Sequence, residues 1–150
     1  MATPDQQPAT APECIFCRII ANEIPASIVD RDEHTIAFMD IAPVTAGHLL
    51  VVPTVHAASL ADLEPAYGER MFAAGQALAA ALRRSGLRCE GVNLMLADGK
   101  AAGQEVFHVH LHVVPRFSDD GARFSWPRQQ AKRETLNQQA AAVRNALGAR

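Results

Sequence analysis

The stretch "FHVHLHVVPR", residues 107–116, places three of the chain's six histidines at every second position of one apolar run. Along an extended strand, alternate side chains lie on one face about 6.5–7 Å apart. His108, His110 and His112 should therefore project from one face of a strand. The other face carries apolar side chains that can pack on a core, namely Phe107, Val109, Leu111 and Val113. Three ionisable rings are costly to bury without partners, so the histidine face predicts a functional site.

Two functional interpretations of the three histidines compete. If all three bound one metal ion, the outer two rings would have to meet around it. On a straight strand they are about 13 Å apart, too far for bonds of about 2 Å to a single ion. The alternative divides the roles among a nucleophile, a phosphate contact and a structural or metal-binding residue. The spacing favours this division of labour.

The segments around the histidine run predict an α+β fold. "SIVDRDEHTIAFMD" (27–40) predicts two short strands joined by a polar turn, and "GHLLVVP" (47–53) and "GVNLMLADG" (91–99) each predict one more. The histidine run should form the last strand, ended by Pro115. Apolar residues at three- and four-residue intervals predict a long helix over 65–85, and a second helix is expected around 132–147. Short connections with one long inserted helix favour an antiparallel sheet over a βαβ repeat.

Length and charge narrow the functional classes. A chain of 150 residues suits one domain, and a formal net charge of −2 argues against broad electrostatic capture of nucleic acid. No apolar run approaches the roughly 20 residues that cross a bilayer, so no membrane partner is expected. The start "MATPDQQPATAPE" does not resemble a secretory signal, which predicts reduced cysteines and a cytoplasmic location. We expect a disordered tail over 1–12 and a single domain over 13–150.

The run "HVHLHVV" (108–114) resembles the His-φ-His-φ-His-φ-φ motif that defines the histidine triad (HIT) superfamily of nucleotide hydrolases and transferases. The likeness extends to "CIFCRIIANEIPASIVDRDEHTIAFMDIAPVTAGHLLVVPTVH" (14–56), "GVNLMLADGKAAGQEVFHVHLHVVPR" (91–116) and "FSWP" (124–127), which resemble the corresponding stretches of bacterial HIT proteins of the Hint-like nucleotide hydrolase branch. It implies the HIT fold, an antiparallel sheet of about five strands with one long helix and a C-terminal helix. It also implies a homodimer that joins two half-sheets into one continuous sheet.

The resemblance assigns a role to each histidine of the catalytic set. His110 would attack the α-phosphorus of a nucleotide to form a covalent nucleotidyl-histidine, and water would then release the nucleoside monophosphate. A neutral imidazole is a competent nucleophile near pH 7, and a carbonyl that accepts from its ring N–H would fix the tautomer. His112 would donate a hydrogen bond to the phosphate, and its identity implies hydrolysis, since the transferase branches carry Gln there. His48 would support the nucleophile through hydrogen bonding.

The resemblance also implies a purine nucleotide pocket. Asp40 would accept from the ribose hydroxyls, and Asn93 would contact the ribose–phosphate part of the ligand. The phosphate-contacting loop would comprise Gly103, Gln104, Glu105 and Val106, and the base would be walled by Ile41, Phe38, Ile15, Phe16 and Ile19. Outside the family context, an Asp at a strand end is usually a turn residue, and the apolar residues would be simple core.

Glu105 departs from the family pattern, which usually has Ser or Thr at this position. A carboxylate near phosphate is repulsive unless it is protonated, turned away or metal-bound. It could act as a general acid or bind the leaving amine of a lysyl-type substrate, and the sequence leaves this choice open.

The pair Cys14 and Cys17 has the C-x₂-C spacing of a zinc knuckle. A thioredoxin-like redox pair is the rival, but the expected strand-then-helix setting is missing. Resemblance to zinc-bearing HIT proteins adds His56 and His108, which gives a Cys₂His₂ set for structural zinc. The alternative is two reduced, buried cysteines. No organic cofactor is expected.

These observations predict a nucleotide hydrolase that cleaves α-phosphate linkages through His110. Purine nucleoside phosphoramidates are expected first as substrates and dinucleoside polyphosphates second. One alternative is a nucleotide-binding or regulatory module with weak or vestigial catalysis, motivated by Glu105. Another is a zinc protein outside the HIT family with no nucleotide site.

Overall fold

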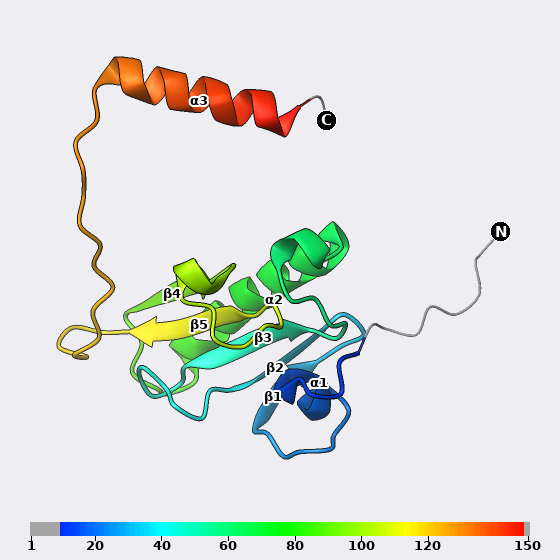
Figure 1. Ribbon diagram of the computed structural model, residues 1–150. Coiled ribbons are helices and arrows are strands. Elements are labelled where there is room, and N and C mark those ends of the chain that lie inside the picture. The colour runs from blue at the N-terminus through cyan, green and yellow to red at the C-terminus, as the bar shows by residue number, and fades with distance from the viewer. Residues whose placement is uncertain (1–9, 149–150) are drawn as a thin grey trace.

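The computed structural model describes residues 10–148 of the chain (Figure 1). Residues 1–9 of the expected N-terminal tail lie outside the described residues, and so do residues 149 and 150 of the expected domain. No helix in the described part is both long enough and apolar enough to cross a membrane.

Over residues 10–148, five antiparallel strands form one sheet in the order β1-β2-β3-β5-β4. They are β1 (Ile28–Arg31), β2 (Thr35–Met39), β3 (Leu49–Pro53), β4 (Gly91–Leu96) and β5 (Leu111–Arg116). The predicted α+β class with a five-stranded antiparallel sheet is confirmed. In the register of the two inner strands, Leu50 lies opposite His112, which places that histidine near the middle of the sheet.

Within the described residues, three α-helices accompany the sheet, α1 (Ile15–Ile20), α2 (Pro65–Arg84) and α3 (Arg133–Leu147). Short 3₁₀ turns lie at η1 (Leu60–Asp62) and η2 (Lys100–Ala102). Helix α2 begins at Pro65, whose missing N–H costs nothing in a first turn, and the chain leaves it at Gly86 with φ +84°. Helix α3 stands apart from the sheet at the end of an extended segment, and none of its residues is buried (Figure 1).

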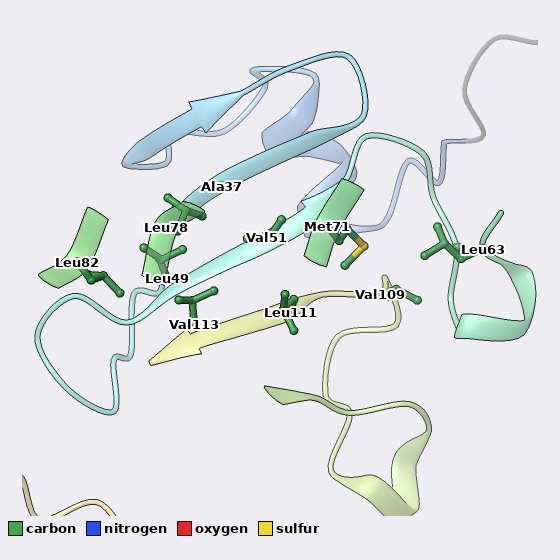
Figure 2. Close-up of a cluster of buried hydrophobic side chains, with 11 residues drawn as sticks. Ala37, Leu49, Val51, Leu63, Met71, Leu78, Leu82, Val109, Leu111 and Val113 are labelled. Carbon is green, nitrogen blue, oxygen red and sulfur yellow. The ribbon is translucent and has the colours of Figure 1, made fainter. Parts of the chain in front are cut away.

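Strand alternation divides the core between the two faces of the sheet. The α2 face buries Ala37, Leu49, Val51, Val109, Leu111 and Val113 against Met71, Leu78 and Leu82 of the helix (Figure 2). The opposite face buries Ile36, Phe38, Leu50 and Val52 against Phe16 and Ile19 of α1. His112 alternates with the α2-facing residues of β5, so the histidines share their side of the sheet with α1.

The histidine run differs from its predicted strand in two respects. Strand β5 begins only at Leu111, so His108 and His110 lie in the segment that leads into it, and the predicted packing residue Phe107 is half exposed. Pro115 does not end the strand, because β5 continues to Arg116 and Pro115 pairs with Val92 of β4. Pairing with β3 stops at Val113, so the missing proline N–H breaks no bond to that strand.

Candidate functional site

Two clusters of polar side chains lie on the α1 face of the sheet, one around His48 and His112 and one around His108. His108 and His110 are buried under Phe16, whose ring meets theirs edge-on at centroid distances of 5.8 and 5.2 Å. His112 lies beside His110, with ring centroids 5.0 Å apart, and continues the row into β5. The alternation expected from the sequence therefore brings all three rings to one side, although only His112 lies within the strand.

The ring of His110 is held in one tautomer by its own backbone neighbour. Its Nδ1 lies 2.7 Å from the carbonyl oxygen of His108. A carbonyl oxygen only accepts hydrogen bonds, so Nδ1 must carry the proton. In the neutral ring, the lone pair is then on Nε2, the atom available to attack an electrophile.

A directional chain of hydrogen bonds connects a loop amide to His112. The backbone N–H of Val44 donates to Nδ1 of His48 at 3.0 Å, so the proton of a neutral His48 sits on Nε2. That Nε2 lies 2.9 Å from Nδ1 of His112, which must accept. The proton of neutral His112 is then on its Nε2. His112 thus offers a hydrogen-bond donor beside the lone pair of His110.

Asp40 completes this cluster from the end of β2. One carboxylate oxygen, Oδ2, lies 3.5 Å from Nε2 of His48, and the other, Oδ1, accepts from the backbone N–H of Ala42 at 2.8 Å. The backbone N–H of Asp40 donates to the carbonyl of His48, which closes the loop between β2 and β3. The acidic residue and the histidine are therefore held together by both their side chains and their backbones.

Burial favours the neutral forms of His112 and His48 at pH 7. Burial, with smaller contributions from the neighbouring His110 and His48, lowers the pKa of His112 to about 4, while Asp40 acts in the opposite direction. Burial also lowers the pKa of His48, again opposed by Asp40. Neutral rings are what the directional chain requires, since a doubly protonated His48 would have no lone pair for the Val44 amide.

The second cluster gathers Cys14, Cys17, His56 and His108, whose candidate ligand atoms all lie within 4.8 Å of one another. Nδ1 of His108 is 3.4 Å from Sγ of Cys14 and 3.6 Å from Sγ of Cys17, and Nδ1 of His56 is 3.4 Å from Sγ of Cys17. A tetrahedral zinc ion separates its sulfur and nitrogen ligands by about 3.5 Å, given the usual bond lengths. The spacing of the four residues fits that ion.

The orientation of His108 also fits a metal ligand. Its Nε2 lies 3.0 Å from the carbonyl oxygen of Pro53, so the proton sits on Nε2 and the Nδ1 lone pair faces the two sulfur atoms. Burial lowers the pKa of His108 to about 4, which keeps that lone pair free at pH 7. The predicted ligand set is therefore brought together with its donor atoms converging.

Asp40, His48 and His112 also lie within reach of one ion, but their geometry indicates a hydrogen-bond network instead. The Val44 amide already occupies Nδ1 of His48, so Nε2 carries a proton and has no lone pair for a metal. The 2.9 Å separation of the two ring nitrogens is a hydrogen-bond distance, shorter than the roughly 3.3 Å between nitrogen ligands of a tetrahedral ion.

The residues of the predicted phosphate-contacting loop differ in burial. The side chain of Gln104 is buried and fixes the 99–106 loop, accepting from the Gly99 amide and donating to the carbonyls of Ala58 and Val106. Gly103 in that loop has φ +91°, a conformation that favours glycine, and Glu105 is exposed.

Asn93 lies on β4 and accepts a hydrogen bond from Nη1 of Arg116 at 2.8 Å. Arg116 in turn pairs with Asp120 at 2.7 Å, so the amide belongs to a network at the end of β5.

The apolar residues expected around the base divide into two groups. Phe16, Phe38 and Ile19 belong to the core under α1. Ile41 is 96% exposed next to Asp40, and Ile15 is about half exposed. The exposed pair offers apolar surface to solvent, which the buried three do not.

Comparison with known proteins gives consistent matches. The family model for the HIT domain matches residues 21–119. The adenosine 5'-monophosphoramidase HNT1 of Saccharomyces cerevisiae is 34% identical over 124 residues, which cover 82% of this chain and 75% of that protein.

Two solved structures show the same likeness. A HIT family protein from Bacillus anthracis superposes with a TM-score of 0.84 at 38% identity, covering 91% of this chain and 99% of that one. A Zn-bound histidine triad family protein from Mycobacterium smegmatis gives a TM-score of 0.72 at 41% identity, covering 89% and 97%.

Proposed function

This chain belongs to the HIT family, and from that premise we propose that it is a nucleotide hydrolase in which His110 is the nucleophile. The observation that carries the proposal is the 2.7 Å hydrogen bond from Nδ1 of His110 to the carbonyl of His108. It leaves the Nε2 lone pair free in a ring that cannot turn without losing a buried bond.

The reaction has two displacement steps at one phosphorus atom. Nε2 of His110 attacks the α-phosphorus, a P–N bond to the ring forms, and the bond from phosphorus to the leaving group breaks. The leaving amine or phosphate departs with the electron pair of that bond and takes up a proton. Water then attacks the nucleotidyl-histidine, and the nucleoside monophosphate leaves with the ring restored.

The neighbouring groups support charge development on the phosphate. His112 offers its Nε2 proton to a non-bridging oxygen, and this proton is directed outward by the chain through His48. We assign Asp40 to the ribose hydroxyls, and we assign Asn93 and the loop of Gly103, Gln104, Glu105 and Val106 to the ribose–phosphate part of the ligand. Ile41 offers apolar surface for a purine base.

Phosphoramidates of a purine nucleoside are the substrates that fit best. The yeast relative is named as an adenosine 5'-monophosphoramidase. Glu105 is exposed on the phosphate loop, where its charge would repel a polyphosphate leaving group and attract an aminium one. Dinucleoside polyphosphates are therefore the second choice.

The decisive experiment is a single-turnover reaction with adenosine 5'-phosphoramidate, quenched without acid and analysed by intact mass. We expect an adenylyl adduct on the wild-type chain and none on His110→Ala, which should still fold and bind AMP. His34→Ala is the matched control, since His34 lies at a surface turn away from the site.

Failure has a defined meaning in this experiment. AMP binding with neither adduct nor AMP release would replace the hydrolase by a nucleotide-binding module. An adduct of equal yield on His110→Ala would move the nucleophile to another residue.

We further propose that Cys14, Cys17, His56 and His108 hold a structural zinc ion. The converging donor atoms support it, and one solved relative is Zn-bound. When bound, zinc would supply a cross-link between α1 and the segment that carries His108 and His110.

Cys14→Ser tests the zinc proposal. We expect zinc content by elemental analysis to fall from about one per chain, and thermal stability to fall by several degrees, because the ligand set is broken. Cys89→Ser should leave the zinc content unchanged, since that thiol hydrogen-bonds the carbonyl of Gly91 and packs against the core outside the ligand set. A wild-type chain purified without zinc and insensitive to added zinc would refute the site.

We also propose that the chain is a homodimer. Strand β4 is an edge of the sheet, and an unpaired edge is a template for a second copy. Exposed apolar residues of α3 present a further unpartnered surface. One domain spanning residues 13–150 is part of the same proposal.

A further inference from the structure

We infer that Thr45 is a positioning residue that sets the direction of the hydrogen-bonded chain from Val44 through His48 to His112. Its catalytic consequence rests on the proposed function, whereas its effect on the two imidazole tautomers does not. The residue does not touch substrate, and it acts through the loop between β2 and β3.

Thr45 connects the two segments that carry the paired histidines. It is only 7% exposed, and its hydroxyl donates to the carbonyl of Pro115 at 2.6 Å. Its own carbonyl accepts from the backbone N–H of His48 at 3.1 Å. One side chain and one peptide group therefore tie the His48 loop to β5, three residues beyond His112.

The hydroxyl fills a position that the sheet leaves open. Pairing of β3 with β5 ends at Leu49 opposite Val113, and continuing this register would set Gly47 opposite Pro115. At Gly47 the chain has not yet entered β3, so the Pro115 carbonyl needs another donor. Thr45 provides it.

Gly47 lets the loop approach β5 closely enough for this bond. Its φ is +99°, and a Cβ there would lie 3.0 Å from Cδ1 of Leu87 and 3.2 Å from Cγ of Pro115. The loop is thus packed on the strand on one side of Thr45 and hydrogen-bonded to it at Thr45 itself.

Because Val44 directly precedes Thr45, holding Thr45 in place also holds the backbone N–H of Val44 in place. The Val44 N–H points at Nδ1 of His48 at 3.0 Å, and a ring with its proton on Nδ1 would place two donors face to face. With that proton excluded, Nε2 of His48 must donate to His112. Without the tie, the opposite tautomer pair becomes accessible, in which His112 turns a lone pair toward an anionic oxygen.

The test is the tautomeric state of the histidines in the free, full-length protein, read from ¹⁵N chemical shifts and two-bond correlations at pH 7.5. In the wild type we expect the Nε2–H form for both His48 and His112. Thr45→Val removes the hydroxyl at constant shape, and we expect it to give mixed tautomers, whereas Thr45→Ser should restore the wild-type pattern. Wild-type His48 in the Nδ1–H form would overturn the inference whether or not any variant folds.

Kinetics with adenosine 5'-phosphoramidate provide the second measurement. Misplacement of a catalytic group costs on the order of tenfold to a hundredfold in rate, so Thr45→Val should lower kcat by at least about tenfold with KM changed less than about twofold. Thr54→Val is the matched control, because Thr54 also donates its hydroxyl to a backbone carbonyl, that of Glu33 at 2.7 Å, but outside this loop.

The outcomes separate this inference from the proposed function. Wild-type tautomers and kcat in Thr45→Val would overturn it. Altered tautomers in Thr45→Val, with no turnover in the wild type, would refute the hydrolase and leave the positioning role supported. Equal losses in Thr45→Val and Thr54→Val would reduce Thr45 to a general contribution to folding.

Discussion

The imidazole of His112 is uncharged in the fold at a pH where a free histidine is partly protonated. Its pKa is lowered from 6.5 to about 4, chiefly by burial. As pH falls, the unfolded chain therefore binds a proton near pH 6.5, while the folded chain resists it until about pH 4. Stability gained from the neutral ring is full above pH 6.5 and is lost between these two values.

This residue should give a measurable slope of stability with pH. We expect the melting temperature to fall as pH decreases from 7 to 5, and to fall less steeply in His112→Asn, which has no ring to protonate. Melting curves by differential scanning calorimetry at fixed ionic strength measure both slopes. Parallel slopes in the two proteins would show that His112 is not the group involved.

At the same scale, the sequence predicts which residues meet and that a carbonyl would fix the tautomer of His110, but not which backbone groups orient the protons. The two-residue period of "HVHLHVV" is enough to place three rings on one side, as found. The tautomers of His48 and His110 depend on a loop amide and a backbone carbonyl. Nearly every residue has a backbone N–H and a carbonyl, so the pattern of side chains does not predict which of these groups will contact a given histidine.

At the level of elements, the loop between β2 and β3 is shaped by a glycine that the histidine site depends on. Gly47 has φ +99° and little room for a Cβ, whereas Gly86 has φ +84° in open space. Gly47→Ala should lower the free energy of unfolding by about 1–3 kcal/mol for the left-handed backbone, with a further loss from overpacking. Gly86→Ala incurs the backbone cost alone.

Chemical denaturation of the two glycine variants measures the difference. We expect Gly47→Ala to be the less stable variant, because its Cβ must displace Leu87 and Pro115. Equal losses would mean that the loop relaxes without resistance. A larger loss in Gly86→Ala would contradict the packing described for this loop.

Most elements follow from the sequence, and the exceptions have local reasons. The 65–85 helix prediction matches α2, because its apolar period and end residues agree. The predicted histidine strand starts too early, since β5 begins only at Leu111, and it ends too early, since β5 continues to Arg116. The sequence does not show that β3 begins only at Leu49, opposite Val113, which is what lets Pro115 remain in a strand.

On the scale of the whole molecule, α3 is the element with an unexplained apolar surface. Leu136, Val143 and Leu147 recur at helical spacing and are all exposed, and an isolated helix of 15 residues is marginal in water. If a second copy covers this stripe, Val143→Asp should shift the mass measured by light scattering from twice the 16.1 kDa chain toward the single chain.

Gln138→Asp is the control for this prediction, since it adds the same charge on the other side of α3. It should leave the dimer intact. A single-chain mass for the unaltered protein would refute the homodimer, and a dimer unaffected by Val143→Asp would place the contact elsewhere, such as at β4.

The hydrogen bonds from the Val44 amide through His48 to His112 run in one direction, and this direction limits which amino acids can replace His112 during evolution. The Nε2–H of His48 donates a hydrogen bond, which residue 112 must accept on one side while it donates another toward the ligand. A glutamine amide has both an accepting oxygen and a donating nitrogen. Histidine and glutamine codons differ by a single nucleotide, so position 112 can change in one mutational step while His48 and the loop behind it stay fixed. A side chain at position 112 that cannot both accept and donate would interrupt the hydrogen bonds that start at the Val44 amide.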